Sequence, residues 1–76
     1  MKELVTFIAQ SLVDDPDQVR VTAVKSDRSV SYEIKVAPGE MGKIIGRGGR
    51  VIHSIRSLVK AASAKTGEHA YVDVMD

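Results

Sequence analysis

The sequence predicts an α+β domain with the element order α-β-β-α-α-β, and three observations lead to this prediction. Apolar residues recur at helical spacing near the N-terminus and again, most clearly, in residues 50–65. Residues 18–25 and 30–36 alternate apolar with polar side chains, which is typical of half-buried strands. No linker, internal repeat or low-complexity segment separates these elements, so residues 1–76 are expected to form one domain.

The first helix is predicted over residues 3–13, and the Asp-Asp-Pro-Asp stretch ends it because proline cannot continue a helix. In residues 18–25, Val19 and Val21 alternate with arginine and threonine. Residues 30–36 alternate strictly, and a short polar link joins the two alternating runs. Together these runs predict a β-hairpin.

The second half of the chain predicts two helices and a strand. Pro38 suits the first turn of a helix, so a short helix is expected over about residues 39–45. A longer helix is predicted over residues 50–65, and a last strand over residues 70–74. The apolar stripe expected to face the core in the long helix is Val51, Ile52, Ile55, Leu58, Val59 and Ala62.

The net charge of +1 hides an uneven distribution along the chain. Residues 1–33 carry four basic and six acidic side chains, whereas residues 34–66 carry seven basic and one acidic. From Lys43 to Lys65 there are six basic residues and no acid. A segment with only positive charges is typical of a surface that binds a polyanion. The alternative interpretation is a helix face that is simply exposed to solvent.

A glycine-rich turn lies inside this basic segment, in the stretch IIGRGGRVIHSI. The turn residues are Gly46, Arg47, Gly48, Gly49 and Arg50. A tight turn between two helices needs backbone angles that side chains obstruct, and the following helix N-terminus favours an anion. Three glycines and two arginines therefore predict a phosphate-binding turn. The alternative is a plain connector, for which one glycine would suffice.

Other glycine-rich phosphate motifs do not fit the sequence. A Walker loop needs GK[ST], and here Gly42 is followed by Lys43 and an isoleucine. The dinucleotide fingerprint GxGxxG would have Val51 in place of its third glycine, and it also requires a strand directly before the turn. No nucleotide cofactor is therefore expected.

Metal binding and catalysis are not expected either. His53 and His69 are far apart in sequence, and the chain has no cysteine. The aspartates around Pro16 are interpreted as a helix terminator rather than as magnesium ligands. No base lies at a usable spacing from a serine, so we expect neither an enzyme nor a metal protein.

The stretch IIGRGGRVIHSI resembles the KH-domain signature of nucleic-acid-binding proteins, [VI]-I-G-x-x-G-x-x-I-x-x-I. The named positions are filled by Ile44, Ile45, Gly46, Gly49, Ile52 and Ile55. A helix and a strand precede the β-α-α-β core, as in the type II KH family, and no further strand and helix follow it. The resemblance therefore covers the whole chain, and at this size it is similar to the small stand-alone bacterial members. It implies a three-stranded sheet with helices packed on one face.

The resemblance also implies a function. In KH domains the GxxG loop, here residues 46–49, clamps the backbone of about four single-stranded nucleotides. The implied RNA-binding residues are Lys43, Ile45, Gly46, Arg47, Gly48, Gly49, Arg50 and Ile52, with Ile34 and Val36 of the second strand facing the isoleucines as a groove floor. For the apolar residues the alternative role is core packing. The sequence leaves open whether RNA or single-stranded DNA is bound, and whether the role is post-transcriptional regulation or RNA chaperoning.

A protein–protein interaction module on the same scaffold is the alternative function, although such a module would not need arginine in its turn. The resemblance implies pairing of the chain with itself or with a larger KH-containing protein. The sequence has no stretch near the ~20 apolar residues that span a membrane, and its N-terminus does not resemble a signal peptide. A cytoplasmic location without membrane attachment is therefore expected.

Overall fold

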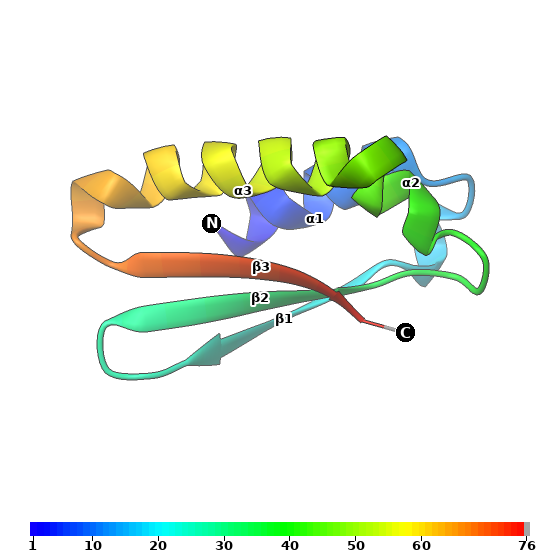
Figure 1. Cartoon of the computed structure of the whole chain (residues 1–76). Coiled ribbons are helices and arrows are strands. Elements are labelled where there is room, and N and C mark those ends of the chain that lie inside the picture. The colour runs from blue at the N-terminus through cyan, green and yellow to red at the C-terminus, as the bar shows by residue number, and fades with distance from the viewer. Residues whose placement is uncertain (76) are drawn as a thin grey trace.

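The computed structural model describes residues 1–75 and shows helices covering one face of a β-sheet (Figure 1). The helices and strands in chain order are α1 (Lys2–Leu12), β1 (Arg20–Lys25), β2 (Ser29–Lys35), α2 (Met41–Ile45), α3 (Arg50–Ser63) and β3 (His69–Met75). Short 3-10 turns cover Pro16–Gln18, Arg47–Gly49 and Ala64–Thr66. The predicted element order and the one-sided helix layer are confirmed, and they match the type II KH fold.

The sheet has the strand order β1-β2-β3. β1 and β2 form the predicted antiparallel hairpin, with Val21 opposite Ile34, whereas β3 runs parallel to β2, with Val74 opposite Ile34. At the hairpin the backbone N–H of Ser26 donates to the carbonyl of Ser29 at 2.9 Å. β2 is therefore central, and β3 leaves one edge of its backbone without a neighbouring strand.

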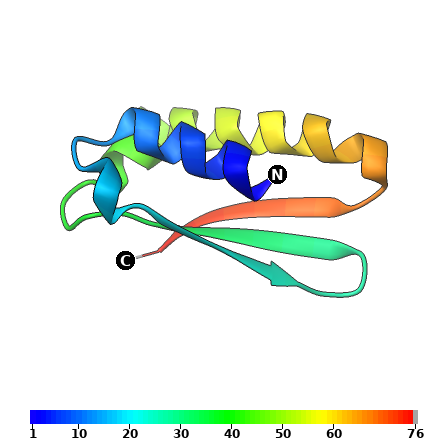
Figure 2. The ribbon, with the colours of Figure 1, turned by 180° about the vertical axis from the view of Figure 1, so that it is seen from behind.

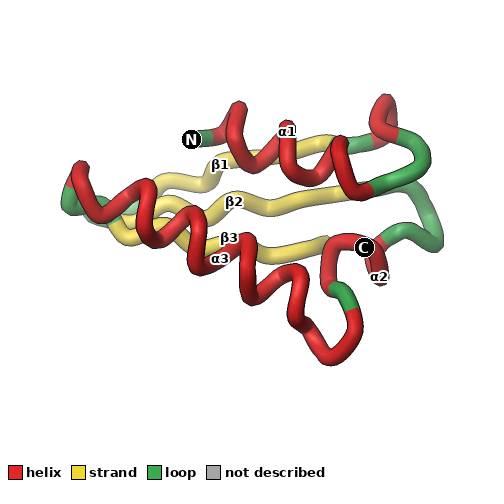
Figure 3. Tube along the Cα trace, turned by 90° about the horizontal axis from the view of Figure 1, so that it is seen from above, coloured by secondary structure: helices red, strands yellow, loops and turns green. Residues whose placement is uncertain are grey.

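The hydrophobic core lies between the helix layer and the sheet, two layers that Figure 2 shows from behind. Seen from above, α1 lies on the β1 side and α3 on the β3 side (Figure 3). The strands contribute alternate residues to this core, because successive side chains of a strand point to opposite faces. The buried apolar residues are Val5, Ala9, Val13, Val19, Val21, Val30, Tyr32, Ile34, Val36, Ile44, Ile52, Ile55, Val59 and Val72.

The start of α2 differs from the prediction. Pro38 does not begin the helix but forms a turn with Gly39, whose φ is 86°. The backbone N–H of Glu40 closes this turn on the carbonyl of Ala37 at 3.1 Å. Proline followed by glycine with positive φ is the residue pair that a type II turn prefers, and the helix then begins only at Met41.

The apolar stripe of α3 is narrower than predicted. Its buried residues are Ile52, Ile55, Val59 and Ser63. Leu58, predicted to be buried, is 51% exposed, and Ala62 is exposed as well. Val51 is partly buried and packs against the core, whereas Leu58 and Ala62 lie toward solvent.

Candidate nucleic-acid interface

The turn between α2 and α3 depends on Gly46. This residue has φ 77° and ψ 171°, a conformation that is essentially restricted to glycine. A Cβ atom there would also lie 2.8 Å from the backbone nitrogen of Val51, closer than such atoms approach one another. Gly46 therefore lets the chain reverse while it touches the first turn of α3. The other two glycines of the turn also have positive φ.

The tip of the turn is open. A Cβ atom on Gly48 would meet nothing within 4 Å, and the neighbouring Arg47 and Arg50 are exposed. Figure 3 shows the turn projecting beyond the sheet on the side of β3. No carboxylate among residues 1–75 forms an ion pair with either arginine. The turn thus presents free positive charge beside the N-terminus of α3, whose backbone N–H groups favour an anion.

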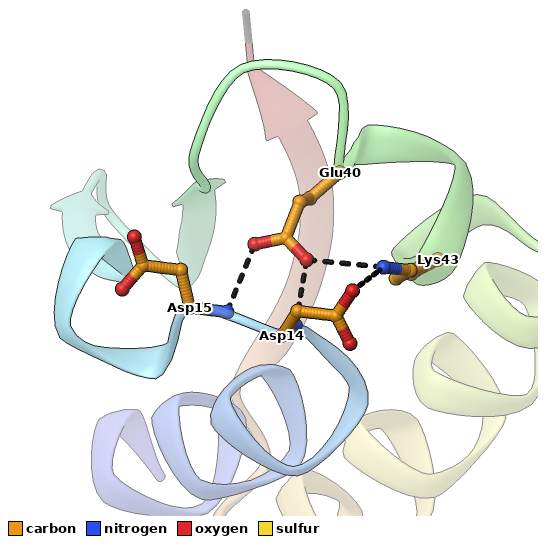
Figure 4. A network of polar contacts seen from close by, with 4 residues as sticks. All are labelled: Asp14, Asp15, Glu40 and Lys43. Atoms are coloured by element: carbon orange, nitrogen blue, oxygen red, sulfur yellow. Dashed lines mark hydrogen bonds and ion pairs between the residues drawn. The ribbon is translucent and has the colours of Figure 1, made fainter.

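Lys43 is in a different state from the arginines. Its ammonium group donates to Asp14 and, at 3.3 Å, to Oε1 of Glu40 (Figure 4). The hydrogen bonds to Asp14 and Glu40 raise the pKa of Lys43 above its ordinary value. Lys43 was predicted as a phosphate partner, but in this conformation two carboxylates already hold it.

The predicted groove residues divide by burial. Ile45 is half-buried at the end of α2, so it keeps apolar surface next to the turn. Val36 and Ile52 are each 7% exposed, and Ile34 is completely buried. Ile34 was predicted to contribute to the groove floor, but in this conformation it presents no surface to a ligand, because β2 is the central strand and Ile34 lies beneath the helices. Ile34 supports the floor of the site without forming its surface.

Sequence reasoning missed the role of β3. This strand lies beside α3 at the edge of the sheet, so its free edge and α3 border the same surface. Nε of Arg56 donates to the carbonyl of Val72 at 2.9 Å, and its Nη2 donates to Asp73 at 3.2 Å. Arg56 thus occupies one outward-facing carbonyl of the edge strand. The parallel pairing of β3 with β2 has no local sequence signal that could have revealed this.

The basic segment is therefore not uniform. Of its six basic residues, Lys43 and Arg56 form ion pairs with carboxylates. The remaining four have no such partner among the described residues, and they are Arg47, Arg50, Lys60 and Lys65. The unpaired charge begins at the turn, continues along α3 and ends in the 3-10 turn that follows it.

Two other features are absent from residues 1–75, a metal site and a membrane-spanning helix. No three histidine or acidic side chains lie close enough together to hold a metal ion, so the aspartates around Pro16 form no such group. Of the helices described, none combines the length and the apolar character needed to cross a membrane.

Comparison with known proteins places this geometry in a family. The family model described as "KhpA/KhpB, KH domain" matches residues 2–74. The protein named RNA-binding protein KhpA from Clostridium acetobutylicum is 45% identical over 75 residues, which cover 99% of this chain and all of that protein. Its namesake from Clostridium perfringens is 47% identical with the same coverage. That from Halalkalibacterium halodurans is 43% identical over the full length of both chains.

A solved structure supports the fold independently. The crystal structure of Aquifex aeolicus Era bound to GDP.AlF4- matches with a TM-score of 0.66 and 20% identity. The match covers 96% of this chain and 28% of that one, and it concerns the fold alone. The element order, the glycine turn between α2 and α3 and the full-length family match agree: the chain belongs to the KhpA/KhpB KH-domain family.

Proposed function

We propose that this protein binds single-stranded RNA and clamps the RNA backbone with the turn of residues 46–50. The observation that carries the proposal is the pairing of an open glycine tip with Arg47 and Arg50, which no described carboxylate neutralises. An exposed turn lets a phosphodiester backbone approach closely, and arginine binds phosphate oxygens through two N–H groups at once.

The surroundings of the turn complete the proposed site. One phosphate lies at the N-terminus of α3, a helix of 14 residues, whose dipole favours an anion. The bases lie over the half-buried Ile45 and the small exposed part of Ile52. The free edge of β3 forms the opposite border, where backbone groups of a strand can pair with base edges. In this arrangement Lys60 in α3 and Lys65 in the 3-10 turn after it add charge further from the turn.

The relatives support RNA rather than another polyanion, because the similar proteins are named RNA-binding proteins. The chain has three aromatic residues, and Phe7 and Tyr71 are exposed away from the turn. Stacking on aromatic rings therefore contributes little at this site, and recognition is loosely sequence-specific. We propose a binding role without catalysis, in post-transcriptional regulation or RNA chaperoning.

The test is a double variant of the turn, Arg47→Asp with Gly48→Asp. It places negative charge where the phosphate lies and keeps Gly46 and Gly49. Aspartate tolerates the positive φ of 64° at position 48 better than most residues, so the fold is expected to survive. RNA affinity, measured by fluorescence anisotropy with a short single-stranded RNA, should fall at least tenfold, or about 1.4 kcal/mol.

The matched control is Lys25→Asp with Ser26→Asp in the hairpin, which changes the net charge by the same amount at the opposite end of the molecule (Figure 1). Its affinity should stay within about twofold of the original, because the Debye length is about 10 Å at ordinary salt. Unchanged binding by a folded turn variant would overturn the proposal. A parallel titration with single-stranded DNA separates the two nucleic acids. Failure to bind either, together with a salt-indifferent protein complex, would instead indicate an interaction module.

A further inference from the structure

The N-terminal side of α2 carries a network of four residues: Asp14, Asp15, Glu40 and Lys43 (Figure 4). Oε1 of Glu40 accepts a hydrogen bond from the backbone N–H of Asp14 at 2.6 Å, and Oε2 accepts one from that of Asp15 at 3.1 Å. Glu40 directly precedes α2, and both aspartates follow α1 in the chain. This carboxylate therefore ties the segment after α1 to the base of α2.

The two carboxylates that hold Lys43 differ in their surroundings. The side chain of Glu40 is 10% exposed and has its own backbone donors, so it is fixed whatever Lys43 does. The side chain of Asp14 is 85% exposed and Lys43 is its one hydrogen-bond partner in residues 1–75. Ion pairs between exposed side chains are screened by water and salt, and they stabilise a fold very little. The contact with Asp14 is therefore the exchangeable one.

Lys43 also lies close to the proposed RNA site. It belongs to α2, three positions before Gly46 and its turn, and its side chain is 43% exposed. A phosphate bound at the turn would be a second anion near the ammonium group of Lys43, which contacts the carboxylate of Asp14 in the free protein. A flexible lysine side chain carries a compact charge that can move from one anion to the other.

We propose that Asp14 restrains Lys43 in the free protein, and that bound RNA takes Lys43 over from Asp14 through a phosphate. This inference rests on the proposed RNA binding and adds a determinant of its strength. Asp14 lowers the RNA affinity, because Lys43 must leave one anion to reach another. Glu40 is a positioning residue in this account: it holds the base of α2 and keeps Lys43 near the turn in both states.

The test compares Asp14→Asn with Asp15→Asn. Both variants remove one negative charge from neighbouring exposed positions, but the side chain of Asp15 makes no contact with Lys43. The RNA affinity of Asp14→Asn should rise about threefold to fivefold, the upper part of the range of one exposed charge pair, and that of Asp15→Asn by less than about twofold. The asparagine keeps the shape of Asp14 and its backbone N–H, so the bond to Glu40 persists.

A double-mutant cycle with Lys43→Gln assigns the effect to the pair. In the original protein this substitution should weaken RNA binding only about twofold. The reason is that Lys43, on binding RNA, gains a contact with a phosphate but loses its contact with Asp14. In the Asp14→Asn background the same substitution should weaken binding at least about fivefold, because nothing then opposes the phosphate. Thermal melting of each variant shows whether the fold is retained.

Equal affinities for the two asparagine variants would overturn the inference, and so would equal effects of Lys43→Gln in the two backgrounds. Either result would leave the RNA proposal standing, since binding itself would still be measured. Absence of RNA binding in the original protein would contradict the proposed function first, and the restraint by Asp14 with it. RNA binding by the original protein therefore distinguishes a failure of the proposed function from a failure of the inference about Asp14.

Discussion

The two ends of α2 are only a few residues apart, yet the basic residue near one end is paired with carboxylates and those beyond the other end are not. At the N-terminal side, Lys43 is held by Glu40 and Asp14 in a hydrogen-bonded network. At the C-terminal side, Arg47 and Arg50 flank an open turn with no described carboxylate within ion-pair distance. Neighbouring basic residues are therefore not equivalent: one serves the local structure in the free protein, and the others are available to a ligand.

The two ends of α2 also differ in what holds them rigid and in how closely a ligand can approach them. The network end is fixed by a buried carboxylate and two backbone donors, whereas the turn end is fixed by backbone geometry and close packing of Gly46. A turn held by glycine conformation needs few side chains around it, so a phosphate can approach. Experiments that disturb one end should therefore leave a different signature from those that disturb the other.

The largest effect is expected from Gly46→Ala. The new methyl group would meet the backbone of Val51 and would occupy a conformation with φ 77°. Such strain costs about 1–3 kcal/mol before the steric overlap is added, so we expect a loss of about 3 kcal/mol or more in the free energy of unfolding. Urea denaturation followed by circular dichroism measures it.

The control for this variant is Gly42→Ala in α2, four residues earlier. A Cβ atom there meets nothing within 4 Å, and its φ is not positive. Because alanine favours a helix over glycine by about 1 kcal/mol, Gly42→Ala should be neutral or stabilising. A Gly46→Ala protein as stable as Gly42→Ala would show that the turn end is not held by its glycine.

An intermediate effect is expected at the network end, in the pH dependence of stability. The hydrogen bond from the backbone N–H of Asp14 lowers the pKa of Glu40 below 4.5, against the effect of burial. The contacts with Lys43 and with the N–H of Asp15 lower this pKa as well. This carboxylate should therefore stabilise the fold fully above pH 4.5, and that contribution should disappear as the pH falls through the lowered pKa. Thermal melting between pH 7 and about pH 3 follows it.

The Glu40→Gln protein should accordingly melt lower than the original at pH 7, and the difference should narrow below pH 4.5. Glu33→Gln serves as the control, because the carboxylate of Glu33 has no hydrogen-bond partner among residues 1–75. If both glutamine variants show the same pH dependence, Glu40 does not organise the base of α2.

The smallest expected effect is a change in the salt dependence of RNA binding, which compares the two ends of α2 directly. Each phosphate neutralised on a single strand adds about 0.7 to the slope of log K against log salt. Arg47→Ala should reduce the slope by about that amount, whereas Lys43→Ala should reduce it less, since Lys43 already has carboxylate partners. Titrations at several salt concentrations measure both, and a larger change for Lys43→Ala would reverse the assignment.

Local patterns predicted much of this molecule. The alternation in residues 30–36 identified β2, and the spacing around Ile52 and Ile55 identified α3, because both patterns depend on nearby residues. The glycines of the turn were predictable for the same reason: their conformations follow from the joint between two helices. The predicted helix start near Pro38 was wrong, because the proline and the glycine after it prefer a turn.

Contacts between distant residues could not be predicted. Asp14 and Lys43 are 29 positions apart, so no local pattern shows that an acid from the first half restrains a base of the second. The edge position of β3 and the complete burial of Ile34 likewise depend on strand order, which alternation alone does not encode. For the candidate site, the glycines and arginines were thus readable from the sequence, but the state of Lys43 was not.

Binding of single-stranded RNA at the turn end of α2 can be located residue by residue. Amide chemical shifts of the ¹⁵N-labelled protein, followed during titration with a short single-stranded RNA, test it most directly. We expect the largest shifts at residues 46–50 and along the α3 side of β3, with small shifts in α1 and the hairpin of β1 and β2. Shifts centred on α1 or on the hairpin, with residues 46–50 unchanged at saturating RNA, would contradict it.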